Sequence, residues 1–244
     1  GGRVSGEIRV PGDKSISHRA VMMGAIASGR TEIHGFLDGE DCIATLAAFR
    51  AMGVHIERPG ATQVVLQGAG MRGLRAPSAA LDLGNSGTGM RLLAGLLCGQ
   101  SFDSTLTGDA SLMRRPMERV AAPLRRMGAD VRTRNGRPPL VIAGNRRLHG
   151  CAHHLDVPSA QVKSAILLAG LFADGRTTVS EPQPSRDHTE RMLGAFGVQV
   201  TRDDATVSLD GPAALAVTRI DIPGDFSSAA FFIVAGLIAG AAPL

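Results

Sequence analysis

The sequence contains no tryptophan and no tyrosine, and only 8 of its 244 residues are phenylalanine. Because the bases of single-stranded nucleic acids stack on aromatic side chains, this shortage argues against single-strand binding. Basic runs are missing as well, and 26 Lys and Arg against 22 Asp and Glu give a net charge of only +4. A mild positive charge suits small anionic ligands, and we expect no nucleic-acid partner.

Cysteine is also scarce, because Cys42, Cys98 and Cys151 are an odd number, far apart and without a C-x-x-C pair. This pattern predicts reduced thiols, buried in a cytoplasmic protein. The longest apolar stretch, residues 229–242, is too short and too rich in glycine to span a bilayer. No signal peptide is recognisable, so we expect no membrane partner. The chain opens at Gly1 without a methionine, and we expect its native start to be missing.

Loops rich in glycine or serine that lead directly into an apolar helix are the most informative feature present. Four of them recur about every 65–75 residues, at residues 11–15, 83–88, 157–161 and 223–228. A helix start leaves backbone N–H groups unpaired, and the helix dipole favours negative charge there. Several such starts brought together would form an anion-binding site.

The same pattern follows each of the first three loops. An apolar helix comes first and a strand containing Thr or Ser second; an amphipathic helix and a hairpin follow. The amphipathic helices end at Gly53, Gly128 and Gly197, which predicts left-handed C-terminal caps. We predict an α/β fold of three βαβαββ units, with three sheets and buried inner helices. The segments are helices at 20–26, 90–97 and 165–171, strands at 31–33, 104–106 and 177–179, and hairpin turns at 59–60, 135–136 and 203–204.

The fourth loop begins a further unit that holds only its first, apolar helix. An apolar helix with nothing following it is hard to bury, so we expect a truncated chain.

The densest polar segment is residues 11–20, at the first helix start. Lys14 and Arg19 lie five residues apart there, and we expect both to reach one anion. Ser15 either caps the helix or donates to that anion. Two other patterns are set aside: residues 68–73 match G-x-G-x-x-G without a following helix, and His153-His154 lacks a third ligand at metal spacing.

Five segments together resemble the signatures of the 5-enolpyruvylshikimate-3-phosphate (EPSP) synthase family of enolpyruvyl transferases. The resemblance covers essentially the whole chain and implies an inverse α/β barrel with two such three-unit domains and a cleft between them. It implies that residues 11–222 form one domain, with units at about 11–75, 76–150 and 151–222, and that 1–10 and 223–244 belong to the second domain. The segments are 11–20, 85–91, 108–117, 159–165 and 186–190.

The resemblance also implies a reaction. The enolpyruvyl group of phosphoenolpyruvate is transferred to the 5-hydroxyl of shikimate-3-phosphate and phosphate is released, a step of the shikimate pathway toward chorismate and the aromatic amino acids. It implies a cytoplasmic transferase without cofactor or metal, monomeric when complete. Glycine at position 87 implies sensitivity to glyphosate, whereas alanine goes with tolerance.

Site residues follow from the same resemblance, position by position. Lys14 would be catalytic and would lie between the two substrate anions. Ala160 stands where many relatives have a serine, so only its backbone N–H can contribute. The implied contacts to shikimate-3-phosphate are Lys14, Ser15, Arg19, Ser159, Ala160, Gln161 and Arg186; those to phosphoenolpyruvate are Lys14, Gly87, Arg115 and Gln161.

The family's carboxylate base and its remaining cationic contacts come from the second domain. We therefore expect this chain alone to bind shikimate-3-phosphate weakly and not to catalyse transfer. Two alternatives remain open. One is the related UDP-N-acetylglucosamine enolpyruvyl transferase, which would carry a Lys-Asn pair in the first loop, where this chain has Lys14-Ser15. The other is a non-catalytic module that binds a phosphorylated metabolite.

Overall fold

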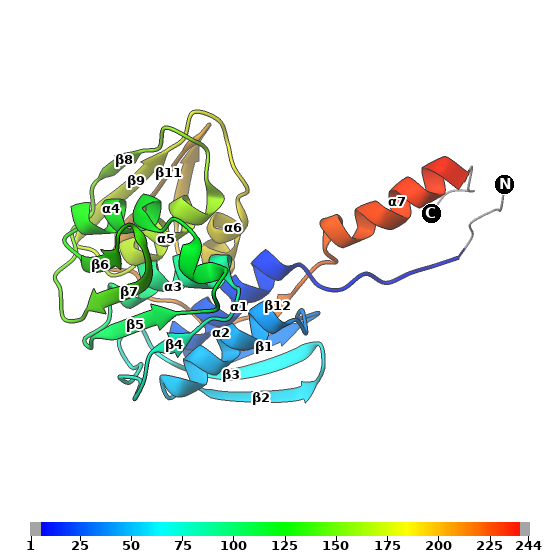
Figure 1. Ribbon diagram of the computed structural model, residues 1–244, viewed down its shortest axis with the longest axis horizontal. Coiled ribbons are helices and arrows are strands. Elements are labelled where there is room, and N and C mark those ends of the chain that lie inside the picture. The colour runs from blue at the N-terminus through cyan, green and yellow to red at the C-terminus, as the bar shows by residue number, and fades with distance from the viewer. Residues whose placement is uncertain (1–5, 240–244) are drawn as a thin grey trace.

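The structure is a computed structural model that describes residues 6–239. Within these residues the chain forms three four-stranded sheets around a group of buried helices (Figure 1). The first unit consists of α1 (Lys14–Ile26), β1 (Ser28–His34), α2 (Glu40–Ala51), β2 (His55–Gly60) and β3 (Gln63–Ala69).

The second and third units have the predicted βαβαββ order. The second consists of β4 (Leu81–Asp82), α3 (Gly87–Leu97), β5 (Ser104–Thr107), the short 3-10 helix η1 (Leu112–Arg114), α4 (Glu118–Arg126), β6 (Asp130–Arg134) and β7 (Arg137–Ala143). The third consists of β8 (Ala152–His154), α5 (Ala160–Gly170), β9 (Gly175–Ser180), α6 (His188–Ala195), β10 (Val200–Asp203) and β11 (Thr206–Gly211).

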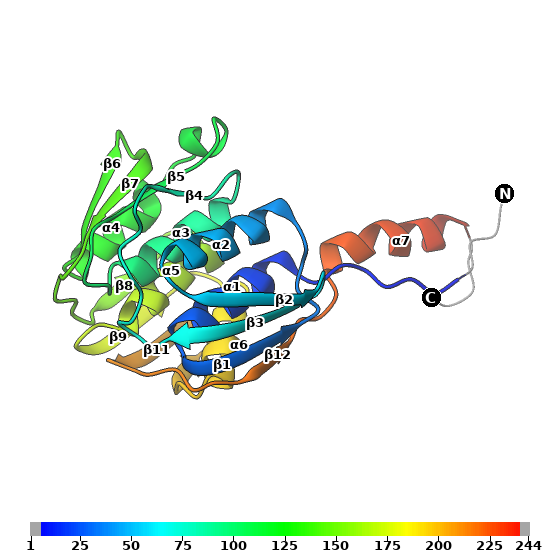
Figure 2. The same cartoon turned by 90° about the horizontal axis from the view of Figure 1, so that it is seen from below.

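Each sheet is built in the same way, but the first takes one strand from far along the chain. The second and third sheets have the orders β4-β5-β7-β6 and β8-β9-β11-β10, and the first has the order β12-β1-β3-β2. Its edge strand β12 (Arg219–Asp221) pairs parallel with β1, Glu32 opposite Arg219 (Figure 2). We expected these residues to belong to the third unit, at about 151–222, whereas in the structure they join the first sheet.

The glycine caps are confirmed, and two of the three turns lie slightly later than predicted. Gly53, Gly128 and Gly197 have φ of +87°, +94° and +84°, the left-handed conformation that ends a helix. The middle hairpin turns at residues 135–136 as predicted, whereas the other two turn at 61–62 and 204–205. In the first hairpin the register shifts between Glu57 and Gly60, which extends β2 through the expected turn.

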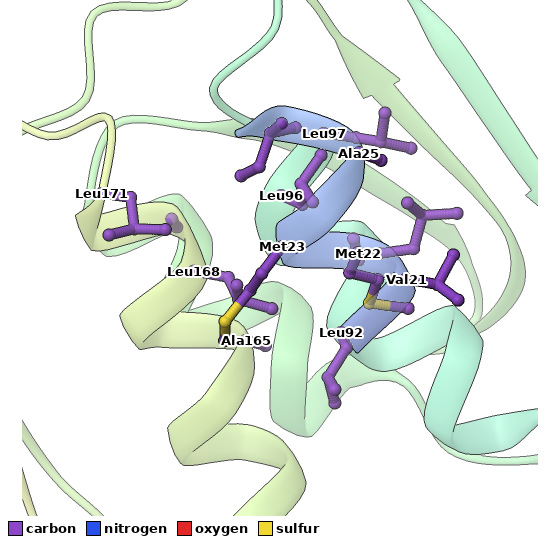
Figure 3. Packing of buried hydrophobic residues seen from close by; sticks show 14 of the residues in the cluster. Val21, Met22, Met23, Ala25, Leu92, Leu96, Leu97, Ala165, Leu168 and Leu171 are labelled. Carbon is purple, nitrogen blue, oxygen red and sulfur yellow. The ribbon is translucent and has the colours of Figure 1, made fainter. Parts of the chain in front are cut away.

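The apolar helices α1, α3 and α5 form the centre of the molecule, as their all-round hydrophobicity predicts. Met23 of α1 points toward Ala165 and Leu168 of α5 (Figure 3). The backbones of α3 and α5 approach closely at Gly95, where an added Cβ would lie 2.1 Å from the carbonyl oxygen of Ala165. A glycine is therefore required at this crossing.

The helix α7 (Phe226–Ala239) extends away from the body of the molecule (Figures 1 and 2). Its apolar side chains face solvent, and those of Phe231, Leu237 and Ile238 are 78–82% exposed. The chain segment before α1 leaves on the same side, and the two segments are joined by hydrogen bonds from Asp13 N to Pro223 O (2.9 Å) and from Asp225 N to Pro11 O (2.8 Å). No helix within residues 6–239 is long and apolar enough to cross a membrane.

A Gly95→Ala substitution should destabilise the fold, because the new Cβ meets rigid backbone. Overpacking of this kind costs about 1–3 kcal/mol, and the short distance argues for the upper end. Gly194→Ala is the matched control, because this exposed position of α6 has no neighbouring atom within 4 Å of an added Cβ. The control should gain about 0.5–1 kcal/mol from the helix preference of alanine. Urea denaturation measures both, and equal stabilities would contradict the close packing.

Candidate functional site

The first helix start is capped by Asp13, not by Ser15. The Asp13 Oδ1 atom accepts a hydrogen bond from the backbone N–H of Ile16 at 2.8 Å. A cap on this N–H needs an acceptor one residue outside the helix, and Ser15 already lies within α1. This removes one of the two roles expected for Ser15. Next to the cap, Lys14 Nζ lies 3.0 Å from Asp41 Oδ2, and the side chain of Lys14 is half exposed.

Arg19 is turned inward, and its side chain joins three helices. Only 2% of the residue is exposed. Its Nε donates to Thr189 Oγ1 at 2.6 Å, its Nη2 to Ser164 Oγ at 2.7 Å and its Nη1 to Ser15 O at 2.8 Å. Burial lowers the pKa of Arg19 to about 10, so the guanidinium stays charged at neutral pH. A shared anion for Lys14 and Arg19 stays a prediction.

At the second helix start, Gly87 leaves room for two guanidinium groups. A Cβ at this position would lie 2.7 Å from Nη1 of Arg115 and 3.2 Å from Nη1 of Arg91. Ser86 caps α3 by accepting from the N–H of Gly89 at 3.0 Å. Arg115 donates through Nη2 to Asn85 Oδ1, which fixes it beside the loop. The absence of a side chain at Gly87 is thus what allows the arginines to reach the helix start.

At the third helix start, Ser159 caps α5 and Gln161 reaches across to α3. The Ser159 Oγ atom accepts from the N–H of Val162 at 3.4 Å and also from Nη2 of Arg119. Gln161 accepts through Oε1 from Arg91 Nη1 at 2.6 Å and donates through Nε2 to Thr88 Oγ1 at 2.9 Å. The second and third loops are therefore in direct contact.

His18 links the first helix start to the second. Its ring lies with Nδ1 2.8 Å from Thr45 Oγ1 and Nε2 3.3 Å from Ser86 Oγ. Burial lowers the pKa of His18 from 6.5 to about 4, so the ring is neutral at physiological pH. Together with the bond of Arg19 to Ser164 and the bonds of Gln161, this contact connects all three helix starts in pairs.

The arginines 91, 115 and 119 concentrate positive charge at the second and third starts. The pKa of Arg91 is lowered by burial and then by the charges of Arg119 and Arg115. Its Nε is buried with no hydrogen-bond partner among residues 6–239. Like charges drawn together in this way are stabilised by an anion between them. The N-termini of α3 and α5 thus carry concentrated positive charge, an arrangement that favours a bound anion.

Arg91 and Arg119 were not among the site residues expected from the sequence. Arg91 ends the second signature segment, so a signal for it was present. Arg119 stands four residues after Arg115, on the exposed face of an amphipathic helix, where arginine is common. Arg186, one of the expected residues, is exposed. The pKa values of Arg19 and His188 are lowered mainly by burial, and the nearby charge of Arg186 lowers them further.

The two adjacent histidines separate onto opposite faces of β8, as neighbouring strand residues do. His153 is buried with Nε2 3.2 Å from Cys151 Sγ, and Nδ1 of the exposed His154 lies 2.6 Å from Ser180 Oγ. Within residues 6–239 no three His, Cys, Asp or Glu side chains are grouped to hold a metal ion.

Burial raises the pKa of Cys42 and Cys98 to about 12, as expected for inert thiols, whereas Cys151 is only half-buried.

Known proteins resemble this chain over nearly its full length. A family model described as EPSP synthase (3-phosphoshikimate 1-carboxyvinyltransferase) matches residues 1–242. The 3-phosphoshikimate 1-carboxyvinyltransferase of Methylococcus capsulatus is 60% identical over 239 residues, which are 98% of this chain and 55% of the relative. That of Alkalilimnicola ehrlichii is 59% identical over 240 residues, which are 98% of this chain and 54% of the relative.

A solved structure agrees with the sequence comparisons. EPSP synthase from Acinetobacter baumannii superimposes with a TM-score of 0.91 at 57% identity, covering 94% of this chain and 52% of that one. The expected α/β fold is thereby confirmed. The chain spans about half the length of the curated relatives it matches.

The neutral state of His18 predicts a loss of stability in mild acid. Because its pKa is about 4 in the folded protein, against 6.5 for a solvated ring, the unfolded chain takes up the proton first as the pH falls. The contribution of His18 to the free energy of unfolding should therefore decrease below about pH 6.5, with a slope approaching about 1.4 kcal/mol per pH unit. His18→Gln removes this titration.

Urea denaturation of both proteins at about pH 7 and about pH 5 measures the effect. The stability advantage of the wild type over His18→Gln should shrink by about 2 kcal/mol at the lower pH. His153, whose pKa burial also lowers to about 4, titrates in both proteins and cancels in the difference. A difference that does not change with pH would show that His18 is not buried in its neutral form.

Proposed function

The chain belongs to the EPSP synthase family, and from this premise we propose that it supplies one half of an active site for enolpyruvyl transfer. The reaction moves the enolpyruvyl group of phosphoenolpyruvate to the 5-hydroxyl of shikimate-3-phosphate and releases phosphate. The observation that carries the proposal is the convergence of Arg91, Arg115 and Arg119 on the N-termini of α3 and α5. Both substrates are anions, and the positive charge concentrated at these helix starts supports the proposal.

Phosphoenolpyruvate fits the second helix start. Its phosphate or its carboxylate can take a bidentate contact from Arg115, and Gly87 lets either group approach the helix N-terminus. As the hydroxyl oxygen of shikimate-3-phosphate bonds to the enolpyruvyl carbon and the phosphate later leaves, negative charge develops on the phosphate oxygens. Guanidinium groups held in place before the reaction stabilise that charge. Gln161 lies between this position and the third loop.

Shikimate-3-phosphate fits the third helix start. Ser159 Oγ accepts from Arg119 and from the N–H of Val162, which leaves its own proton free to donate to a phosphate oxygen. The backbone N–H groups of Ala160 and Gln161 open α5 and add two further donors. Arg186 would approach from the loop before α6.

Lys14 is proposed to lie between the two substrates, as a catalytic residue that offsets their repulsion. In the structure it pairs with Asp41 on an exposed side chain. Exposed pairs of this kind contribute about 0.2–1 kcal/mol, so a doubly charged ligand readily displaces the carboxylate. Ser15 and the buried charge of Arg19 would support the same ligand from the first helix start.

The rest of the active site is proposed to come from a second domain that covers α7. The exposed phenylalanine and leucine side chains of α7 provide an apolar surface for it. We propose that this domain brings the carboxylate base, that the complete enzyme is a cytoplasmic monomer acting on these two small anions, and that this chain alone is inactive.

Reconstitution tests the proposed function. The purified chain should bind shikimate-3-phosphate weakly by calorimetry and release no phosphate from the two substrates. Addition of a polypeptide that carries the remaining half of the Methylococcus capsulatus relative should restore phosphate release. Turnover by the chain alone would contradict the half-site. Turnover with UDP-N-acetylglucosamine instead would identify the other transferase, and binding without turnover in the reconstituted protein would identify a non-catalytic module.

Gly87→Ala in the reconstituted enzyme tests the phosphoenolpyruvate site. The added Cβ would lie 2.7 Å from Arg115 Nη1, so the guanidinium proposed to hold phosphoenolpyruvate must leave its present position. We expect KM for phosphoenolpyruvate to rise about tenfold, equivalent to about 1.4 kcal/mol, with little change in kcat. Inhibition by glyphosate should weaken in parallel. Gly194→Ala is the control, and an unchanged KM in Gly87→Ala would place phosphoenolpyruvate elsewhere.

A further inference from the structure

The carboxylate of Glu181 joins the two loops proposed to hold shikimate-3-phosphate. It follows β9 directly, and its side chain is 1% exposed. Its Oε1 accepts from the backbone N–H of Ser159 at 2.7 Å. Its Oε2 accepts from the hydroxyl of Ser185 at 2.7 Å and, more weakly, from the N–H of Ser185 at 3.4 Å. Ser159 caps α5, and Ser185 precedes Arg186, so one side chain fixes both loops.

A buried lysine makes this arrangement possible. Lys163 Nζ lies 2.9 Å from Oε2 of Glu181 and 2.8 Å from Oε1 of Glu190, and all three side chains are at most 4% exposed. Burial raises the pKa of Glu181, but the hydrogen bonds from Ser185, Lys163 and Ser159 outweigh it, and the net shift is downward. The carboxylate is therefore ionised at neutral pH.

The charges in this buried layer balance. Glu190 also acts on Arg19, whose pKa it raises against the larger effect of burial. Two buried carboxylates are thus matched by two buried cations: Lys163, which contacts both, and Arg19, which feels the charge of Glu190. Without Lys163, the charge of Glu181 would lie directly behind a phosphate site and repel its ligand. With it, the carboxylate holds Ser159 at little electrostatic cost to an anion in front of the loop.

The bond to Glu181 also determines which donors remain for the ligand. The N–H of Ser159 is occupied, so it cannot donate to a phosphate. The hydroxyl of Ser159 and the N–H groups of Ala160 and Gln161 are left to face the site. Since buried ion pairs are seldom more stabilising than well-packed apolar residues, stability alone does not explain a carboxylate here.

We propose that Glu181 is a positioning residue for the phosphate of shikimate-3-phosphate, and that Lys163 neutralises it. It acts by holding Ser159 and the loop of Arg186 at a fixed separation. The identity of the ligand rests on the proposed function, whereas the holding of the loops does not.

Glu181→Gln in the reconstituted enzyme tests the proposal. Glutamine keeps one acceptor oxygen but turns an NH₂ group toward the other loop and no longer neutralises Lys163. We expect KM for shikimate-3-phosphate to rise at least about tenfold, with KM for phosphoenolpyruvate and kcat within about threefold of wild type. Glu190→Gln is the matched control, because it removes the other buried partner of Lys163 and has no hydrogen bond to either loop among residues 6–239. Its KM for shikimate-3-phosphate should change less than about threefold.

Amide hydrogen exchange of the chain without ligand gives a second readout, independent of turnover. Peptides covering residues 157–161 and 182–187 should exchange faster in Glu181→Gln and not in Glu190→Gln. An unchanged KM, an equal rise of both KM values, or unchanged exchange would overturn the proposal. If the wild type shows no turnover, the proposed function fails. In that case the role of Glu181 is decided by two comparisons of Glu181→Gln with the wild type: the rate of amide exchange in the two loops, and the affinity for inorganic phosphate measured by calorimetry.

Discussion

The close packing of α1, α3 and α5 is the constraint on which the site depends. Gly95 allows the backbone of α3 to touch α5 at Ala165, and apolar side chains fill the space between the three helices. Because their starts are then held near one another, short side chains can connect them: His18 to Ser86, and Gln161 to Thr88. The starts of the three helices lie together because the helices behind them are closely packed.

Charge is arranged in two layers at this end of the molecule. The deeper layer is balanced, since the two buried carboxylates of Glu181 and Glu190 are matched by the two buried cations Lys163 and Arg19. The outer layer is not balanced, since Arg91 meets the charges of two further arginines and keeps a buried Nε without a partner among residues 6–239. Burial makes an unbalanced charge costly, so the outer layer favours a bound anion. The balanced layer can fix geometry without competing for that anion.

The sequence predicted those features of the fold that leave a local pattern. Apolar runs identified the inner helices, and the glycine at the end of each outer helix located its cap. The pairing of β12 with β1 was not predictable, because parallel strands far apart in sequence share no local signal. The sequence analysis considered Ser15 as the cap of the first helix and not Asp13, although both residue types cap helices and only the structure distinguishes them. The burial of Arg19 depends on α6 packing over it, and Arg119 differs from other exposed arginines only in its neighbours.

The three loops are alike in sequence pattern but differ in the charge of their caps. A carboxylate caps α1, and Asp13 therefore offsets the positive end of that helix. Ser86 and Ser159 cap α3 and α5 and leave those ends positive. At the first loop the positive charges are therefore those of side chains, Lys14 and Arg19, whereas the other two loops combine uncapped backbone N–H groups with arginines. A repeated scaffold thus gives one helix start a charge-compensating cap with an exposed lysine beside it, and gives the other two neutral caps with arginines beside them.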